Sequence, residues 1–190
     1  MLSTGDFKRG LRILVDGEPW TIEDYSVQTP SARGAATLVR TKLRSILSGS
    51  LIEKTFKSGE KFEEPDVSIK QVQYLYGDGD AHHFMDQDSY EQHALSQSDL
   101  EEDGPWLTDG LQLYAVFYNG RMVGVNLPQQ VEAEIAMAGA GSRTDTASGR
   151  NLKDATLSNG VQIKVPLFVE IGDRVIVDPR TREFVRRAKA

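Results

Sequence analysis

One arginine stands among short side chains in the segment QTPSARGAAT, residues 28–37. The residues around Arg33 are small or turn-forming: Pro30, Ser31, Ala32, Gly34 and Ala35. Pro30 restricts one backbone angle and Gly34 permits positive φ, so the segment can form a shaped turn. A guanidinium presented by small neighbours can enter a crowded site, where it can clamp a phosphate or stack on a base. An ordinary surface loop has the same composition, so both interpretations stay open here.

The same part of the chain is rich in positive charge. Between residues 30 and 57 only Glu53 opposes six basic residues: Arg33, Arg40, Lys42, Arg44, Lys54 and Lys57. The last five are candidates for neutralising phosphates of RNA. Strands with one wet face also carry Lys and Arg, so charge alone does not decide between binding and solvation. On alternating strands only some of these side chains can share a face.

The chain of 190 residues has 22 basic and 28 acidic residues, a formal net charge of −6. Nearly all of this acidity lies in residues 66–128, where 2 basic residues face 11 acidic ones. Because salt screens exposed charges beyond about 10 Å, a basic part of the protein can meet RNA while the acidic part faces away. The sequence contains no cysteine, which excludes disulfides, iron–sulfur clusters and thiol catalysis. No apolar run approaches the roughly 20 residues of a membrane span, so we expect a cytoplasmic protein without membrane contact.

Signals that would suggest an enzyme are weak. His82 and His83 stand near three aspartates, but adjacent residues of a strand point to opposite faces and are poorly placed to bind one metal ion. The acidic pairs 63–64 and 101–102 are typical of solvated runs, since neighbours in sequence are not opposed across a cleft. No serine lies in a nucleophile-elbow context. We therefore expect no catalytic residue, no metal and no cofactor.

The hydrophobic pattern predicts an all-β protein. Residues 11–27 read as two strands around Asp16-Gly17, and residues 111–128 as a hairpin around Asn119-Gly120, both two-residue turn signals. Further strands are expected at 36–43, 51–58, 67–76, 82–86 and 131–137, and further hairpins at 154–169 and 173–185. Residues 88–104 are the best helical candidate.

Two segments suggest domain boundaries. The polar stretch 58–66 contains Pro65 and lacks periodicity, which predicts a linker, and Pro128 marks a second boundary. The boundaries divide the chain into modules 1–65, 66–128 and 129–190. Modules of about 60 residues have marginal cores, so neighbours are expected to share an interface. Small closed barrels avoid exposed sheet edges, and five-stranded barrels often bind RNA, so we expect barrels.

The chain resembles bacterial elongation factor P over nearly its full length. The stretches that carry the resemblance are ordered as in the family: DFKRGLRILVDGEPW (6–20), VRTKLRSILSGSLIEKTFKSGEKFE (39–63), YLYGDGDAHHFMD (74–86), DATLSNGVQIKVP (154–166) and VPLFVEIGDRVIVDPRTREFV (165–185). The resemblance implies three consecutive small β-barrel domains in an L-shaped, tRNA-mimicking arrangement. The first, 1–65, would be SH3-like (KOW-type) and carry the tip loop, and 66–128 and 129–190 would be OB-folds.

The resemblance also implies a function. Members of the family bind the 70S ribosome between the P and E sites and place the first-domain loop beside the CCA end of P-site peptidyl-tRNA. They relieve stalling at consecutive prolines without being enzymes. Arg33 would occupy the loop tip, with Pro30 and Gly34 shaping its presentation.

The loop string TPSARGAATL (29–38) is more similar to the paralogous elongation factor P-like protein. In elongation factor P itself, the tip is usually a shorter turn with a modified lysine, or an arginine variant that is rhamnosylated. Two alternatives stay open: elongation factor P proper with a modified Arg33, and an OB-fold RNA-binding protein that acts independently of the ribosome.

The segment GSRTDTASGR (141–150) matches a family loop that reaches toward the E-site mRNA codon. The family pattern there is Gly-Asp-Thr or Gly-Asp-Asn, whereas Thr144 precedes Asp145-Thr146 here. The candidates for RNA contact in this segment are Arg143, Asp145, Thr146 and Arg150. The expected partners are therefore ribosomal RNA, peptidyl-tRNA and the codon, bound by a monomer.

Overall fold

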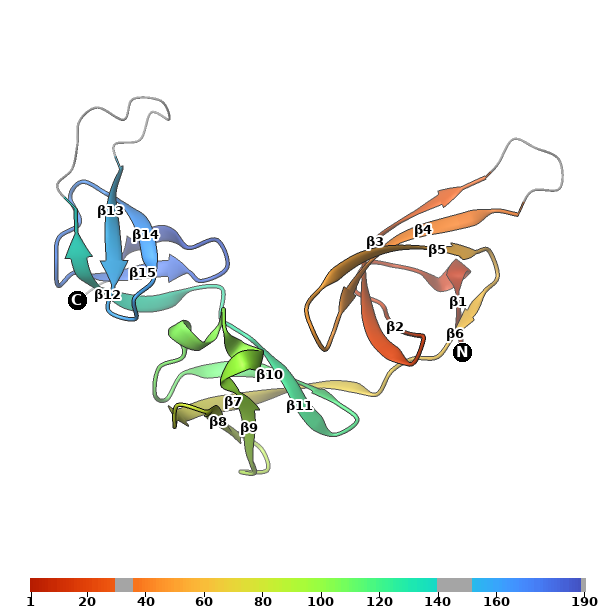
Figure 1. Ribbon diagram of the computed structural model, residues 1–190, viewed down its shortest axis with the longest axis horizontal. Coiled ribbons are helices and arrows are strands. Elements are labelled where there is room, and N and C mark those ends of the chain that lie inside the picture. Colours follow the sequence, from red (N-terminus) through yellow and green to blue (C-terminus); the bar gives the residue numbers. More distant parts are fainter. Residues whose placement is uncertain (30–35, 140–151, 189–190) are drawn as a thin grey trace. The chain divides into compact units, whose positions relative to one another are not determined.

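Residues of alternating hydrophobicity form strands throughout the computed structural model, which describes residues 1–29, 36–139 and 152–188 (Figure 1). In those residues the only helices are three short 3-10 turns: η1 (Thr4–Asp6), η2 (Gln97–Leu100) and η3 (Gly104–Trp106). The predicted all-β class is confirmed. The chain forms two compact units, Met1–Ile69 with Val116–Gly124 and Lys70–Ala115 with Val125–Ala190.

The first sheet is antiparallel, in the order β2-β3-β4-β5. Its strands are β2 (Arg12–Val15), β3 (Glu18–Gln28), β4 (Leu38–Ser45) and β5 (Leu51–Lys57). Asp16 and Gly17 join β2 to β3 with φ values of 55° and 83°, the positive angles that a type I′ turn requires, so the predicted hairpin is confirmed. Two short strands, β1 (Leu2–Ser3) and β6 (Lys61–Phe62), pair with each other.

Part of the segment 58–66, predicted to be a linker, belongs to this first fold. Phe62 is buried, and its ring centroid lies 5.4 Å from that of Phe7 and 4.8 Å from that of Phe56. The Leu14 backbone N–H donates to the Glu63 carbonyl at 2.9 Å. The linker prediction is wrong as far as Glu63, because a single buried aromatic ring outweighs the polar residues around it.

The second sheet has five strands in the order β11-β10-β7-β8-β9. The strands are β7 (Val67–Gly77), β8 (Ala81–Asp86), β9 (Gln92–Ser96), β10 (Gln112–Tyr118) and β11 (Arg121–Asn126). Asn119 and Gly120 join β10 to β11 with φ values of 49° and 76°, which confirms the second predicted hairpin.

The helix predicted over residues 88–104 is wrong. Strand β9 pairs with β8 and places Leu95 opposite His82, and both side chains are buried. The turns η2 and η3 follow. Leu95 and Leu100 are the buried leucines of this acidic segment, too few for the apolar stripe of a helix, and pairing with β8 buries Leu95 instead.

The third sheet closes into a barrel in the order β12-β13-β14-β16-β15. Its strands are β12 (Val131–Ala138), β13 (Leu152–Leu157), β14 (Gln162–Pro166), β15 (Arg174–Asp178) and β16 (Glu183–Arg187). All neighbours are antiparallel except β14 and β16, which run parallel. Branched aliphatic side chains fill the interior, including Ile135, Val165 and Val177, each 0% exposed.

One member of the barrel's core comes from outside its strands. Trp106 of η3 is 3% exposed and belongs to the same buried cluster as Ile135, Leu157 and Val165. The Asn159 side-chain amide donates to the Pro105 carbonyl at 2.9 Å, beside the tryptophan in sequence. The η3 segment and the barrel strands belong to the same compact unit, which comprises Lys70–Ala115 and Val125–Ala190. The indole therefore completes the barrel's core from the segment that precedes β10.

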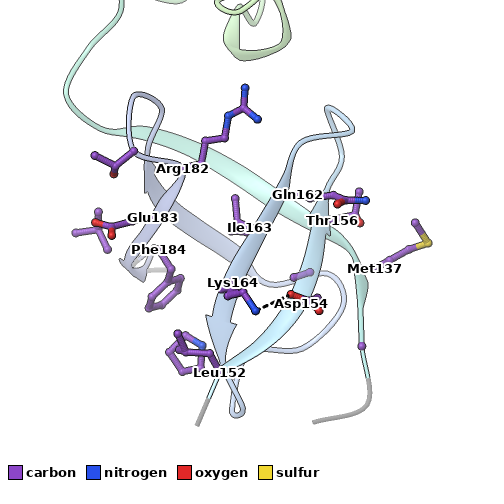
Figure 2. A pocket seen from close by; sticks show the side chains of 15 residues that line it. Met137, Leu152, Asp154, Thr156, Gln162, Ile163, Lys164, Arg182, Glu183 and Phe184 are labelled. Atoms are coloured by element: carbon purple, nitrogen blue, oxygen red, sulfur yellow. Dashed lines mark ion pairs between the residues drawn. The ribbon is translucent and has the colours of Figure 1, made fainter. Parts of the chain in front are cut away.

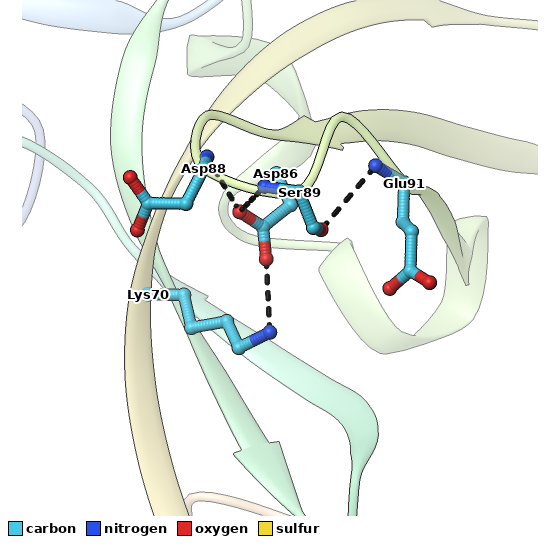
Figure 3. Close-up of polar contacts among 5 residues, drawn as sticks. All are labelled: Lys70, Asp86, Asp88, Ser89 and Glu91. Carbon is cyan, nitrogen blue, oxygen red and sulfur yellow. Dashed lines mark hydrogen bonds and ion pairs between the residues drawn. The ribbon is translucent and has the colours of Figure 1, made fainter.

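A buried carboxylate organises the turn after β8 (Figure 3). The Asp86 side chain is 1% exposed and pairs with the Lys70 ammonium at 2.9 Å. It also accepts backbone N–H bonds from Asp88 at 2.8 Å and Ser89 at 3.1 Å. The Lys70 ammonium, followed by these two N–H groups, holds the pKa of Asp86 far below its usual range.

We predict that Asp86→Ala lowers the free energy of unfolding by about 2–4 kcal/mol, because it leaves a lysine and two N–H groups without their buried acceptor. Asp88→Ala is the matched control, since the Asp88 side chain is exposed and contributes its backbone N–H. Because the folded pKa of Asp86 is depressed, its contribution should be complete above about pH 4 and decline as pH falls toward the folded pKa. Urea unfolding at pH 7 and at lower pH measures both effects, and equal stability of the two variants would contradict the assignment.

Candidate nucleic-acid interface

Strands β3 and β4 form the long hairpin that carries the candidate tip. Their pairing runs from Trp20 opposite Ser45 to Gln28 opposite Leu38. The predicted tip residues lie outside the described residues: Pro30, Ser31, Ala32, Arg33, Gly34 and Ala35. Strands β3 and β4 bring Gln28 and Leu38, on either side of this segment, opposite each other at one end of the sheet (Figure 1).

Strand β4 separates its basic residues cleanly from its core residues. Arg40, Lys42 and Arg44 are exposed, whereas the alternate positions from Val39 to Ser45 are buried. The period of two is what places the three cations on one side of the sheet. Val39 and Leu43 pack in the core on the other side.

The pairing of β4 with β5 assigns the two remaining candidate lysines to different faces. Lys57 lies opposite Leu38, which shares the outward side with Arg40. Lys54 lies opposite buried Thr41, and its ammonium forms an ion pair with Asp16. Four of the five predicted cations therefore share a surface, called here the basic face: Arg40, Lys42, Arg44 and Lys57. Lys54 is not part of it.

Acidic partners occupy the half of the basic face farther from the tip. Lys42 pairs with Glu53 at 3.8 Å, and Arg44 pairs with Glu23 at 2.7 Å. Asp24 is the cross-strand neighbour of Lys42, and its carboxylate forms an ion pair with Arg9 at 2.8 Å. The hydrogen bond from Arg9 is the main cause that lowers the pKa of Asp24.

The half nearer the tip has a different character. Arg40 lies between Ser26 on β3 and Thr55 on β5. Within the described part of the chain, neither Arg40 nor Lys57 has a carboxylate within ion-pair distance. Of the four cations of the basic face, Arg40 and Lys57 are therefore the two that no carboxylate of the described residues neutralises.

Glu23 and Asp24 are the residues that the sequence pattern did not single out. Glu23 pairs with Arg44, whereas Asp24 lies opposite Lys42 and pairs with Arg9. Both acids stand about 20 residues from Lys42 and Arg44 in the chain. If residues 11–45 are taken as strands of one sheet, Glu23 and Asp24 lie on the strand that pairs with β4. A bulge between Ile22 and Asp24 shifts that register, and no composition signal announces it.

The second predicted RNA contact lies in the connection between β12 and β13. Arg143, Asp145, Thr146 and Arg150 fall outside the described residues. Gly139 and Leu152, the described residues on either side of this connection, help to line a pocket of about 970 Å³ in the C-terminal barrel (Figure 2).

The pocket of Figure 2 carries both signs of charge. Lys164 pairs with Asp154 at 3.4 Å across β13 and β14, and Arg182 and Glu183 line another side. Its lining also includes exposed or partly exposed apolar groups such as Met137 and Phe184. Such a mixture of charges does not favour the binding of a phosphate, so the pocket gives no separate support to the predicted RNA contact.

The adjacent histidines point to opposite faces, as predicted. His82 is 8% exposed and shares a hydrogen bond of 3.1 Å between its Nδ1 and the Tyr74 hydroxyl. His83 stacks on Tyr76 and pairs through Nε2 with Asp78 at 2.8 Å. That contact with His83 is the largest cause that lowers the pKa of Asp78 to about 2. The two rings therefore serve separate local structures.

No helix in the described residues is long and apolar enough to cross a membrane.

Three family models match the chain in succession: the elongation factor P KOW-like domain over residues 3–62, the elongation factor P OB domain over 67–125, and the elongation factor P C-terminal domain over 131–187.

Similar proteins agree with these matches. Elongation factor P of Moorella thermoacetica is 42% identical over 188 residues, covering 99% of this chain and all of that protein. Elongation factor P 1 of Geobacter sulfurreducens is also 42% identical over 188 residues, with the same coverage. Among solved structures, a eukaryotic-type translation initiation factor 5A from Methanococcus jannaschii has a TM-score of 0.53 at 24% identity. It covers 66% of this chain and 92% of its own, and this likeness concerns the fold.

Proposed function

The chain belongs to the elongation factor P family and is a translation elongation factor, and we propose that it binds the 70S ribosome between the P and E sites and speeds peptide bond formation at consecutive prolines. Arg33, at the tip of the β3–β4 hairpin, contacts the CCA end of P-site peptidyl-tRNA in this proposal. The observation that carries it is the basic face, where Arg40 and Lys57, which no carboxylate of the described residues pairs with, lie at the end of the sheet next to the tip segment.

The mechanism requires positioning rather than chemistry by the protein. Proline reacts poorly because its ring restricts both the nascent chain and the attacking amine. Holding peptidyl-tRNA in reactive geometry can supply up to about 7–11 kcal/mol in favourable systems, without an acid, base or nucleophile. The protein is therefore a non-enzymatic factor that assists the ribosomal peptidyl transferase. Pro30 and Gly34 shape the backbone that presents Arg33.

Within the family, we assign the chain to the elongation factor P-like paralogue on the loop string ARGAATL. The competing assignment is elongation factor P proper with a rhamnosylated Arg33. Intact mass of the protein purified from its own cells separates the two, because an added sugar mass on Arg33 would overturn the first.

The basic face is proposed to neutralise phosphates of tRNA or ribosomal RNA next to the tip, and the segment with Arg143, Asp145, Thr146 and Arg150 to approach the E-site codon. The chain acts as a monomer in this account.

Sedimentation with ribosomes stalled at prolines, compared with binding to generic single-stranded RNA, tests the ribosomal role. Preference for free RNA would favour a ribosome-independent RNA-binding protein instead.

We predict that Arg40→Gln and Lys57→Gln each weaken ribosome binding and its salt dependence. The slope of log affinity against log salt should decrease in magnitude by about 0.7–0.9 for each phosphate contact that is lost. Lys54→Gln is the matched control, because Lys54 lies on the opposite side of the sheet and pairs with Asp16. Binding measured between low and moderate salt checks this, and an equal loss in the Lys54 variant would remove the distinction between the faces.

A further inference from the structure

Strand β3 contains one extra residue on the way to the tip segment. Ile22 lies opposite Leu43 of β4. The next pair along the hairpin is Asp24 and Lys42, so Glu23 has no residue across from it. A β-bulge of this kind bends its strand, increases the local twist and changes the direction of the residues that follow. The direction in which the hairpin continues is therefore set at this bulge.

The bulge also decides which side of β3 faces the core. Ile22 is buried, and strict alternation would place Asp24 on the same side of the sheet. Instead, Asp24 lies opposite exposed Lys42, and Val27 lies opposite buried Val39. Without the extra residue, every later side chain of β3 would turn to the other face.

Two ion pairs hold the bulge from its two neighbouring strands. Glu23 pairs with Arg44 of β4 at 2.7 Å. The Oδ1 of Asp24 accepts two hydrogen bonds from Arg9, at 3.1 Å from Nε and 2.8 Å from Nη2. Arg9 lies in the turn before β2, and β2 and β4 flank β3 in the sheet. The bulge is therefore tied to both sides of β3.

The backbone next to Arg9 is held beside the bulge. The Gly10 N–H donates to the Ile22 carbonyl at 2.8 Å, and the Ile22 N–H donates to the Leu11 carbonyl at 2.8 Å. Beyond Ile22, the Arg9 side chain is the group that reaches β3 from this side, at Asp24. The guanidinium thus restrains the first residue of the hairpin beyond the bulge from a fixed base.

The pair of Arg9 and Asp24 is exposed, with 73% and 49% of the side chains accessible. Exposed ion pairs contribute little to global stability. A bulge interrupts the ladder of backbone hydrogen bonds, however, so side-chain contacts there act on the local direction of the strand. The consequence of this pair is therefore sought in geometry rather than in stability.

We infer that Arg9 and Asp24 are positioning residues, which hold the bulge in the geometry that directs the β3–β4 hairpin toward peptidyl-tRNA. The inference rests on the proposed function, in which Arg33 contacts the CCA end. Arg9 and Asp24 touch no substrate in this account and act through the tip. A misplacement of about 1 Å can cost roughly 100-fold in rate, so a small change of direction at the bulge is sufficient.

The test measures single-turnover peptide bond formation on ribosomes stalled at consecutive prolines, over a range of protein concentrations. We expect Arg9→Gln and Asp24→Asn each to lower the maximal rate about 5-fold, part of what a 1 Å misplacement can cost. The double variant should lose no more than either single variant, because both remove the same contact. Asp16→Asn is the matched control, since it makes the same charge change and breaks the exposed pair with Lys54 at the start of β3.

The two single variants also separate positioning from charge. Asp24→Asn removes a negative charge and Arg9→Gln a positive one, so a purely electrostatic role would shift the half-saturating concentration in opposite directions and leave the maximal rate unchanged. That result, or an equal loss of rate in Asp16→Asn, would overturn the inference. Full activity of Arg33→Ala in the same assay would instead remove the proposed function, and this inference with it.

Spin labels measure the direction of the hairpin without the ribosome. The chain contains no cysteine, so cysteines introduced at position 28, the end of β3, and at position 47, in the turn after β4, are labelled specifically. We expect the distance distribution between the labels to be shifted or broadened by Arg9→Gln and by Asp24→Asn, but not by Asp16→Asn. A distribution that neither variant changes would overturn the inference and leave the proposed function standing.

Discussion

Arg33→Ala should reduce translation through a Pro-Pro-Pro reporter to nearly the level found without the protein. Arg33 is the one long side chain among residues 30–35, and its neighbours are too short to replace the proposed contact with the CCA end. Losing about 2–3 kcal/mol of positioning would slow bond formation roughly 30–150-fold, a small share of what orientation can supply. Ribosome binding should fall far less, because the basic face stays intact.

Arg33→Lys separates two ways in which this side chain can act. A planar, forked contact predicts that lysine restores little activity, whereas a simple charge requirement predicts near-complete rescue. Lys54→Ala serves as the control for removal of a cation from the same domain. Reporter translation that is unchanged in Arg33→Ala would remove the tip from the mechanism.

Trp106→Ala is expected to destabilise the C-terminal barrel by about 3–5 kcal/mol, the usual cost of removing a fully buried large aromatic side chain. The indole is 3% exposed within a cluster of barrel residues, although it is carried by η3. The barrel's core is therefore incomplete without the central segment, and the two should unfold together. Amide hydrogen exchange of β12–β16 in the full-length protein measures this directly.

Two further variants calibrate the tryptophan result. Asn159→Ala removes the hydrogen bond to Pro105 and the one that the Asn159 side chain accepts from the Val161 backbone N–H, and should cost about 1–3 kcal/mol. Phe168→Ala should be nearly neutral, because that ring is 60% exposed on the same barrel. Unchanged exchange in the barrel of Trp106→Ala would show that the barrel is self-sufficient.

The parts of the fold that local chemistry determines could be predicted from the sequence. Asp16-Gly17 and Asn119-Gly120 announce type I′ turns, since few other pairs tolerate two positive φ angles. Alternation over β4 gave its buried and exposed sides correctly. The failures were non-local: Phe62 and β9 are held by partners distant in sequence, so composition suggested a linker and a helix.

Part of the candidate site could likewise be predicted from the sequence, and part of it depends on strand pairing. The resemblance pointed to the tip and the charge count to the hairpin, but neither could separate Lys54 from Lys57. That distinction depends on which residues of β4 and β5 lie opposite each other. The ion pairs of Glu23 with Arg44 and of Asp16 with Lys54 likewise depend on the pairing register of the strands. A shift of one residue would turn these side chains to the other face of the sheet.

The central claim is that Arg33 meets the acceptor end of peptidyl-tRNA. A cryo-electron microscopy structure of this protein on a ribosome stalled at consecutive prolines measures it most directly. We predict the Arg33 guanidinium within hydrogen-bonding or stacking distance of the CCA nucleotides, with Arg40 and Lys57 facing RNA phosphates. A bound state in which Arg33 lies away from every tRNA while stalling is relieved would contradict the account.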